Sequence, residues 1–129
     1  MRKEITVALY GCRYIRSDWR YDQDEAGLTA FFAALQNELA PLGIGLRWGR
    51  EEGVVLDVRG YGDLLNTVRL RSPQDGIVNL CLGHVIGQSA KLDLLEDIRR
   101  GVSRIAFAPE MIEPEGENKR VCHNCGCGC

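Results

Sequence analysis

Thiol chemistry is concentrated at the C-terminal end of this 129-residue sequence. Four of the six cysteines and one of the two histidines lie in the last eight residues, CHNCGCGC. Thiolates bind soft or borderline metal species such as copper(I), zinc or iron–sulfur units. The pattern therefore predicts a metal site whose ligands are Cys122, Cys125, Cys127 and Cys129, with His123 as a further candidate.

The spacing of these cysteines suits chelation of a metal ion. In an extended segment alternate side chains share a face, so Cys125, Cys127 and Cys129 start on one side. Gly126 and Gly128 have no Cβ, which lets the backbone curl around an ion. One tetrahedral site made from four ligands within eight residues would be strained, so we expect paired chelates or a shared cluster. A functionless reduced tail is the alternative interpretation.

The stretch VCHNCGC at residues 121–127 resembles the metal claw of nitrile hydratases, which has the pattern Val-Cys-x-x-Cys-x-Cys. The resemblance implies non-haem iron or non-corrin cobalt at the claw. It covers seven residues, and the rest of the sequence does not resemble that family. We therefore interpret the shared spacing as convergent.

Cys12 is the candidate for thiol chemistry outside the tail. It follows the first predicted strand and precedes a long predicted helix, where a thiol can be exposed and reactive. A small buried hydrophobic residue is the equally open alternative. Arg13, Arg16 and Arg20 follow it and could bind an oxyanion. Their alternation with aromatic residues is also typical of a nucleic-acid patch, but the nearby aspartates dilute the charge and favour a solvated loop with cation–π contacts.

Two further residues are predicted to be structural. Cys81 lies within an apolar strand-like run, which favours a place in the core. His84 follows that run without the Cys/His spacing of a metal site, which favours a surface loop.

The amino-acid composition indicates which broad class of protein this is. The sequence is 45% apolar and 26% charged with a net charge of −2, which is typical of a globular protein without a nucleic-acid or membrane surface. The apolar run from Ile5 to Tyr10 is too short for a signal peptide or a membrane span. We expect a cytoplasmic protein whose thiols stay reduced.

Periodicity predicts the elements that position these residues. Residues 4–10 are expected to form a buried strand, and a helix should run from an Asp24 cap to Pro41. Further strands are expected at 44–48, 54–58, 77–82 and 104–108, with 64–70 ambiguous between helix and strand. A second helix, capped by Ser89 and including Leu92, should end near Gly101.

This order predicts an α/β domain over residues 1–108, a small sandwich with a central mixed sheet and two main helices. A linker over 109–120 and a Cys-rich tail over 121–129 should follow. The element order and Cys12 resemble the thioredoxin-like arrangement, which implies that fold. Cys12 is followed by Arg-Tyr-Ile, so the Cys-x-x-Cys that reductase activity needs is missing.

The leading hypothesis is a non-enzymatic soft-metal-binding protein that holds or transfers an ion through its tail. The α/β domain, called the body below, would dock to a protein partner. One alternative is a thiol-disulfide redox protein that uses Cys12 and the tail cysteines. Another is a tail that a separate enzyme modifies. The metal, the oligomeric state and the completion of the site by a second chain stay open.

Overall fold

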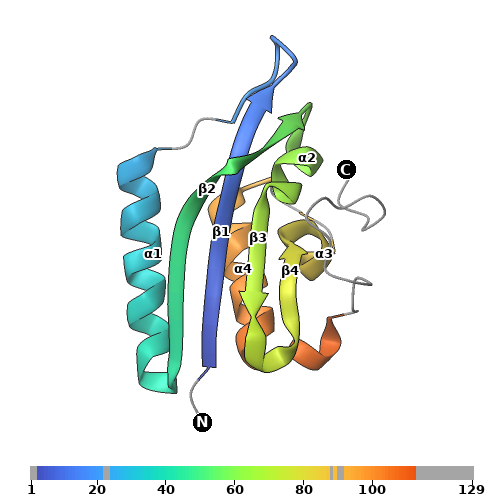
Figure 1. The fold of residues 1–129 in the computed structure, drawn as a ribbon. Coiled ribbons are helices and arrows are strands. Elements are labelled where there is room, and N and C mark those ends of the chain that lie inside the picture. Colours follow the sequence, from blue (N-terminus) through green and yellow to red (C-terminus); the bar gives the residue numbers. More distant parts are fainter. Residues whose placement is uncertain (1–2, 22–23, 88, 90–91, 113–129) are drawn as a thin grey trace.

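A four-stranded mixed sheet forms the centre of the protein (Figure 1). A computed structural model describes residues 3–21, 24–87, 89 and 92–112. The strands, in the spatial order β2-β1-β3-β4, are β1 (Lys3–Tyr14), β2 (Ile44–Val58), β3 (Val68–Ser72) and β4 (Ile77–Cys81). β1 and β2 run parallel, whereas the β1–β3 and β3–β4 pairs are antiparallel. The predicted α/β class with a central mixed sheet is confirmed.

Two long helices accompany the sheet, α1 (Glu25–Leu39) and α4 (Leu94–Phe107). Figure 1 shows α1 alongside β2, and α4 behind β1 and β3. None of the helices in the described ranges is both long and apolar enough to cross a membrane. The short elements are two helices, α2 (Tyr61–Asn66) and α3 (Leu82–Ile86), and three 3-10 turns, η1 (Ala40–Leu42), η2 (Pro73–Asp75) and η3 (Pro109–Met111).

α1 begins where the sequence predicts. The side chain of Asp24 accepts a hydrogen bond from the backbone N–H of Gly27, which satisfies a donor at the helix N-terminus. Its apolar residues Leu28, Phe32, Leu35 and Leu39 are buried, and the ring of Phe32 stacks on that of Trp48 in β2 with centroids 4.6 Å apart. Gly43, with φ of 76°, ends the turn that follows the helix.

α4 differs from its prediction at both ends. It begins after Asp93 rather than at Ser89, and Leu92 is exposed with φ of 52°. It also continues past Gly101 to Phe107, so the strand expected at 104–108 is wrong. Gly101 is a packing glycine, because a Cβ there would lie 2.6 Å from Cδ1 of Leu82.

The middle of the chain also differs from its predicted secondary structure. The two strands expected at 44–48 and 54–58 are one strand, β2, interrupted by a bulge. Tyr10 pairs with Glu51, but Gly11 pairs with Val55, so three residues of β2 loop out between them. The ambiguous segment 64–70 is divided between the end of α2 and the start of β3.

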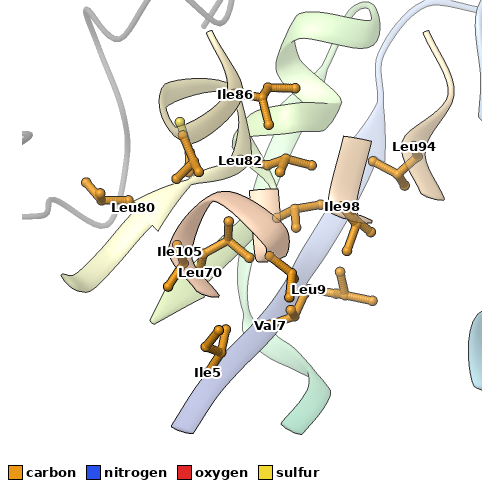
Figure 2. Close-up of a cluster of buried hydrophobic side chains, with 14 of the residues drawn as sticks. Ile5, Val7, Leu9, Leu70, Leu80, Leu82, Ile86, Leu94, Ile98 and Ile105 are labelled. Carbon is orange, nitrogen blue, oxygen red and sulfur yellow. The ribbon is translucent and has the colours of Figure 1, made fainter. Parts of the chain in front are cut away.

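The main core lies between the sheet and both long helices. Val7 pairs with Trp48, on which Phe32 of α1 stacks, so α1 covers the sheet face that carries Val7. Figure 2 shows side chains of α4, including Ile98 and Ile105, gathered with those of β1 on this face. Among the described residues, the buried apolar cluster spans residues 5–105.

Candidate functional site

The predicted metal ligands of the tail, Cys122, His123, Cys125, Cys127 and Cys129, lie outside the described residues. In the part of the chain that is described, no three His, Cys, Asp or Glu side chains are grouped so that they could hold a metal ion. Two cysteines of the body are described, Cys12 and Cys81.

Cys81 is a core residue, as predicted, with 2% of its surface exposed. Its Sγ accepts a hydrogen bond from the backbone N–H of His84 at 3.4 Å and so caps α3. His84 lies in that helix, so the surface loop expected there is wrong. The helix follows β4 directly because the cap satisfies one of its first donors.

Cys12 occupies a different environment, near the carboxyl end of β1. It is partly exposed and lines a cavity of about 380 Å³ together with Tyr14, Tyr21 and other residues. After the bulge in β2, residues 11–14 of β1 pair with residues 55–58, so β1 extends beyond its predicted end. The sheet therefore holds Cys12 on a fixed backbone.

Tyr14 connects Cys12 to the loop that follows β1. Its hydroxyl donates to the carbonyl of Tyr21 at 3.1 Å, which closes the loop back over the end of the strand. Burial is the main reason that the pKa of Tyr14 is raised to about 12, and the charge of the Cys12 thiolate and its hydrogen bond add to it. The guanidinium of Arg20, 5.3 Å from the ring centroid, acts in the opposite direction.

The structure separates the three arginines that follow Cys12. Arg13 forms an ion pair with Asp57, and Arg16 forms one with Asp18, both at 2.6 Å. Arg20 lines the Cys12 cavity instead, and its position over Tyr14 confirms the predicted cation–π contact.

Arg50 of β2 is the residue that sequence reasoning missed. It lines the Cys12 cavity and forms an ion pair with Glu25, in the first turn of α1, at 2.7 Å. The available signal was the strand–helix–strand order, because it predicts that β2 pairs in parallel with β1, the pairing that places Arg50 beside Leu9.

The contact between Cys12 and Tyr14 is testable. In Cys12→Ala, the pKa of Tyr14 should fall from about 12 part of the way toward its ordinary value of 10.0. The shift is partial because burial, the largest cause, remains. NMR titration with ring-labelled tyrosine measures it, and Tyr14→Phe assigns the signal. Cys81→Ala should leave the titration unchanged; an unchanged titration in Cys12→Ala would contradict the contact.

The site therefore combines a partly exposed thiol and a neutral phenol near the carboxyl end of β1 with two guanidinium groups, Arg20 from the loop after β1 and Arg50 from the middle of β2. Such a set can bind an anion, expose a thiol to exchange or contribute a thiolate ligand. Comparisons with protein-family models, with curated proteins and with solved structures find no match to this chain.

Proposed function

We propose that this protein binds a soft or borderline metal species through the thiolates of its tail and holds it or passes it to a protein partner. The ligands are Cys122, Cys125, Cys127 and Cys129, with His123 available as a fifth. The observation that carries the proposal is their density, four thiols within eight residues with glycine spacers. Copper(I), zinc and iron–sulfur units suit such ligands, and the cytoplasm keeps them reduced.

We propose that the body folds independently of the tail and that the tail binds the metal. The described residues form a buried cluster over residues 5–105, and the proposal leaves the tail thiols to bind a metal. Seventeen residues follow Ile112, and a chain of that length spans at most about 60 Å. The tail can thus present an ion to a partner that docks on the body.

We also propose that the body has a thioredoxin-like arrangement. The support is a parallel β1-α1-β2 unit, followed by two antiparallel strands and a closing helix, with Cys12 toward the end of β1. The departures are the ten residues between β1 and α1 and the missing second cysteine after Cys12. The proposal therefore covers the arrangement and not reductase chemistry.

A metal titration tests the proposed function. The reduced full chain and a chain ending at Arg120 are titrated anaerobically with copper(I) and with zinc against a competing chelator. The full chain should bind metal and the shorter chain should not, because the shorter chain lacks all four tail thiols. Equal stoichiometry in the two chains would overturn the proposal.

A thiol-disulfide redox function is the second candidate, favoured by the partial exposure of Cys12 in its cavity. The Nζ of Lys3 donates to the carbonyl of Ile105 at 2.7 Å, so α4 ends beside the start of β1. Cys12 lies nine residues further along β1, about 30 Å away in an extended strand. Cys129 is seventeen residues beyond Ile112 and can span that distance within one chain.

Mass spectrometry of the protein purified from a reducing cytosol separates these candidates. A reversible disulfide between the tryptic peptide at 4–13, which contains Cys12, and the tail peptide would favour the redox function. Bound metal without that crosslink would favour the metal function. A covalent adduct on the tail would instead show that another enzyme modifies it.

A further inference from the structure

The Cys12 cavity has a positively charged lining. Two of its described residues, Arg20 and Arg50, carry guanidinium groups, and the described lining contains no Asp or Glu. Guanidinium groups bind carboxylates and phosphates through paired N–H···O bonds. We propose that this cavity binds a small molecule through an oxyanion, a carboxylate or a phosphate, which Arg50 and Arg20 contact beside the Cys12 thiol.

Arg20 is placed for this role by its aromatic neighbour. Arg13 and Arg16, its neighbours in the sequence, are neutralised by Asp57 and Asp18, whereas Arg20 lies over the ring of Tyr14. A guanidinium stacked on a ring keeps its N–H donors in its own plane, where they can reach a ligand. Tyr14 adds no negative charge at neutral pH, because its hydroxyl stays protonated and donates to Tyr21.

Arg50 already binds an oxyanion, the carboxylate of Glu25. That ion pair is exposed, with 37% of the Arg50 side chain and 64% of the Glu25 side chain accessible to solvent. Exposed ion pairs are weak, so a ligand oxyanion can replace Glu25 at Arg50. Glu25 is therefore an internal competitor, and its removal should strengthen ligand binding.

The other end of α1 supplies a matched control. Glu38 and Arg99 form an ion pair at 2.6 Å with side-chain exposures of 52% and 38%, close to the values for Glu25 and Arg50. Neither residue lines the Cys12 cavity. Glu38→Gln and Arg99→Gln thus change the net charge as Glu25→Gln and Arg50→Gln do, away from the proposed site.

The experiment measures protection of Cys12 in the reduced full chain in metal-free buffer. Iodoacetamide modification is followed on the tryptic peptide at 4–13, which keeps Cys12 separate from the tail thiols. Inorganic phosphate and acetate are titrated separately at constant ionic strength. We expect at least one of them to slow modification, because a bound oxyanion blocks access to the thiol and disfavours thiolate formation.

The variants should change the concentration of phosphate or acetate that is needed to protect Cys12, in opposite directions for the arginines and for Glu25. Arg50→Gln and Arg20→Gln should each raise it about tenfold, as expected for losing a charge-assisted contact. Glu25→Gln should lower it several-fold, and Glu38→Gln and Arg99→Gln should leave it unchanged. Arg50→Lys, which keeps the charge but not the planar fork, should weaken protection by an intermediate amount and serves if Arg50→Gln fails to fold.

Two results would overturn the proposal. Equal shifts in Glu25→Gln and Glu38→Gln would show a general effect of net charge. Absence of protection by both phosphate and acetate in the unsubstituted chain would show that the cavity does not bind an oxyanion. Protection by only one of them would identify the oxyanion as phosphate or carboxylate. These outcomes are separate from the metal titration, because no tail residue takes part.

Discussion

Phe32→Ala is expected to lower the free energy of unfolding by about 3–5 kcal/mol. Phe32 is fully buried in α1 and stacks on Trp48 of β2. Truncation removes this contact and leaves a void between the helix and the sheet. At roughly 3–6 °C per kcal/mol for a domain of this size, the melting temperature should fall by roughly 10 °C or more.

Phe31→Ala is the matched control for this prediction. Phe31 is the adjacent residue of α1 and is only partly buried against the core, so its truncation should cost clearly less. Urea unfolding monitored by circular dichroism measures both variants. A loss in Phe32→Ala no larger than that in Phe31→Ala would contradict the described packing of α1 on β2.

The second large effect concerns the tail. Replacing Cys122, Cys125, Cys127 and Cys129 together by Ser should abolish tail metal binding while leaving the melting temperature within a few degrees. The reason is that the described residues already form a large buried apolar cluster over residues 5–105. A structural metal site would behave differently, because its binding free energy would contribute to folding.

Thermal unfolding and metal titration of this fourfold variant check both parts of the prediction. A fall in melting temperature of roughly 15 °C or more, which corresponds to several kcal/mol, would show that the tail stabilises the body around an ion. The function of the tail would then be a structural metal site rather than metal transfer.

The elements predicted most accurately from the sequence are those whose signals are local. The β-branched and apolar residues at 4–10 predict β1, and the Asp24 cap predicts the start of α1. The end of α4 was missed because a glycine after two arginines is also the usual signal for a helix end. The close approach of Leu82 and Leu70 to Gly101 identifies it as a packing glycine rather than a capping one.

In the candidate site, too, the sequence predicts local features but not tertiary contacts. Cys12 could be singled out because a cysteine at a strand end is a local feature, but Arg50 reaches it through strand pairing and a bulge in β2. Arg13 and Arg20 look equivalent in the sequence, and only the tertiary position of Asp57 separates their roles. The metal ligands of the tail remain a prediction from the sequence.

Metal binding by the tail is tested most directly by elemental analysis of the full chain, purified without a metal-affinity tag from a reducing cytosol. The fourfold Cys→Ser variant is purified in parallel, and the mass of each in solution is measured alongside. The full chain should carry copper, zinc or iron in stoichiometric amount while the variant carries only background, and the mass shows whether two chains share the ion. Equal metal content in the full chain and the variant would contradict metal binding by the tail.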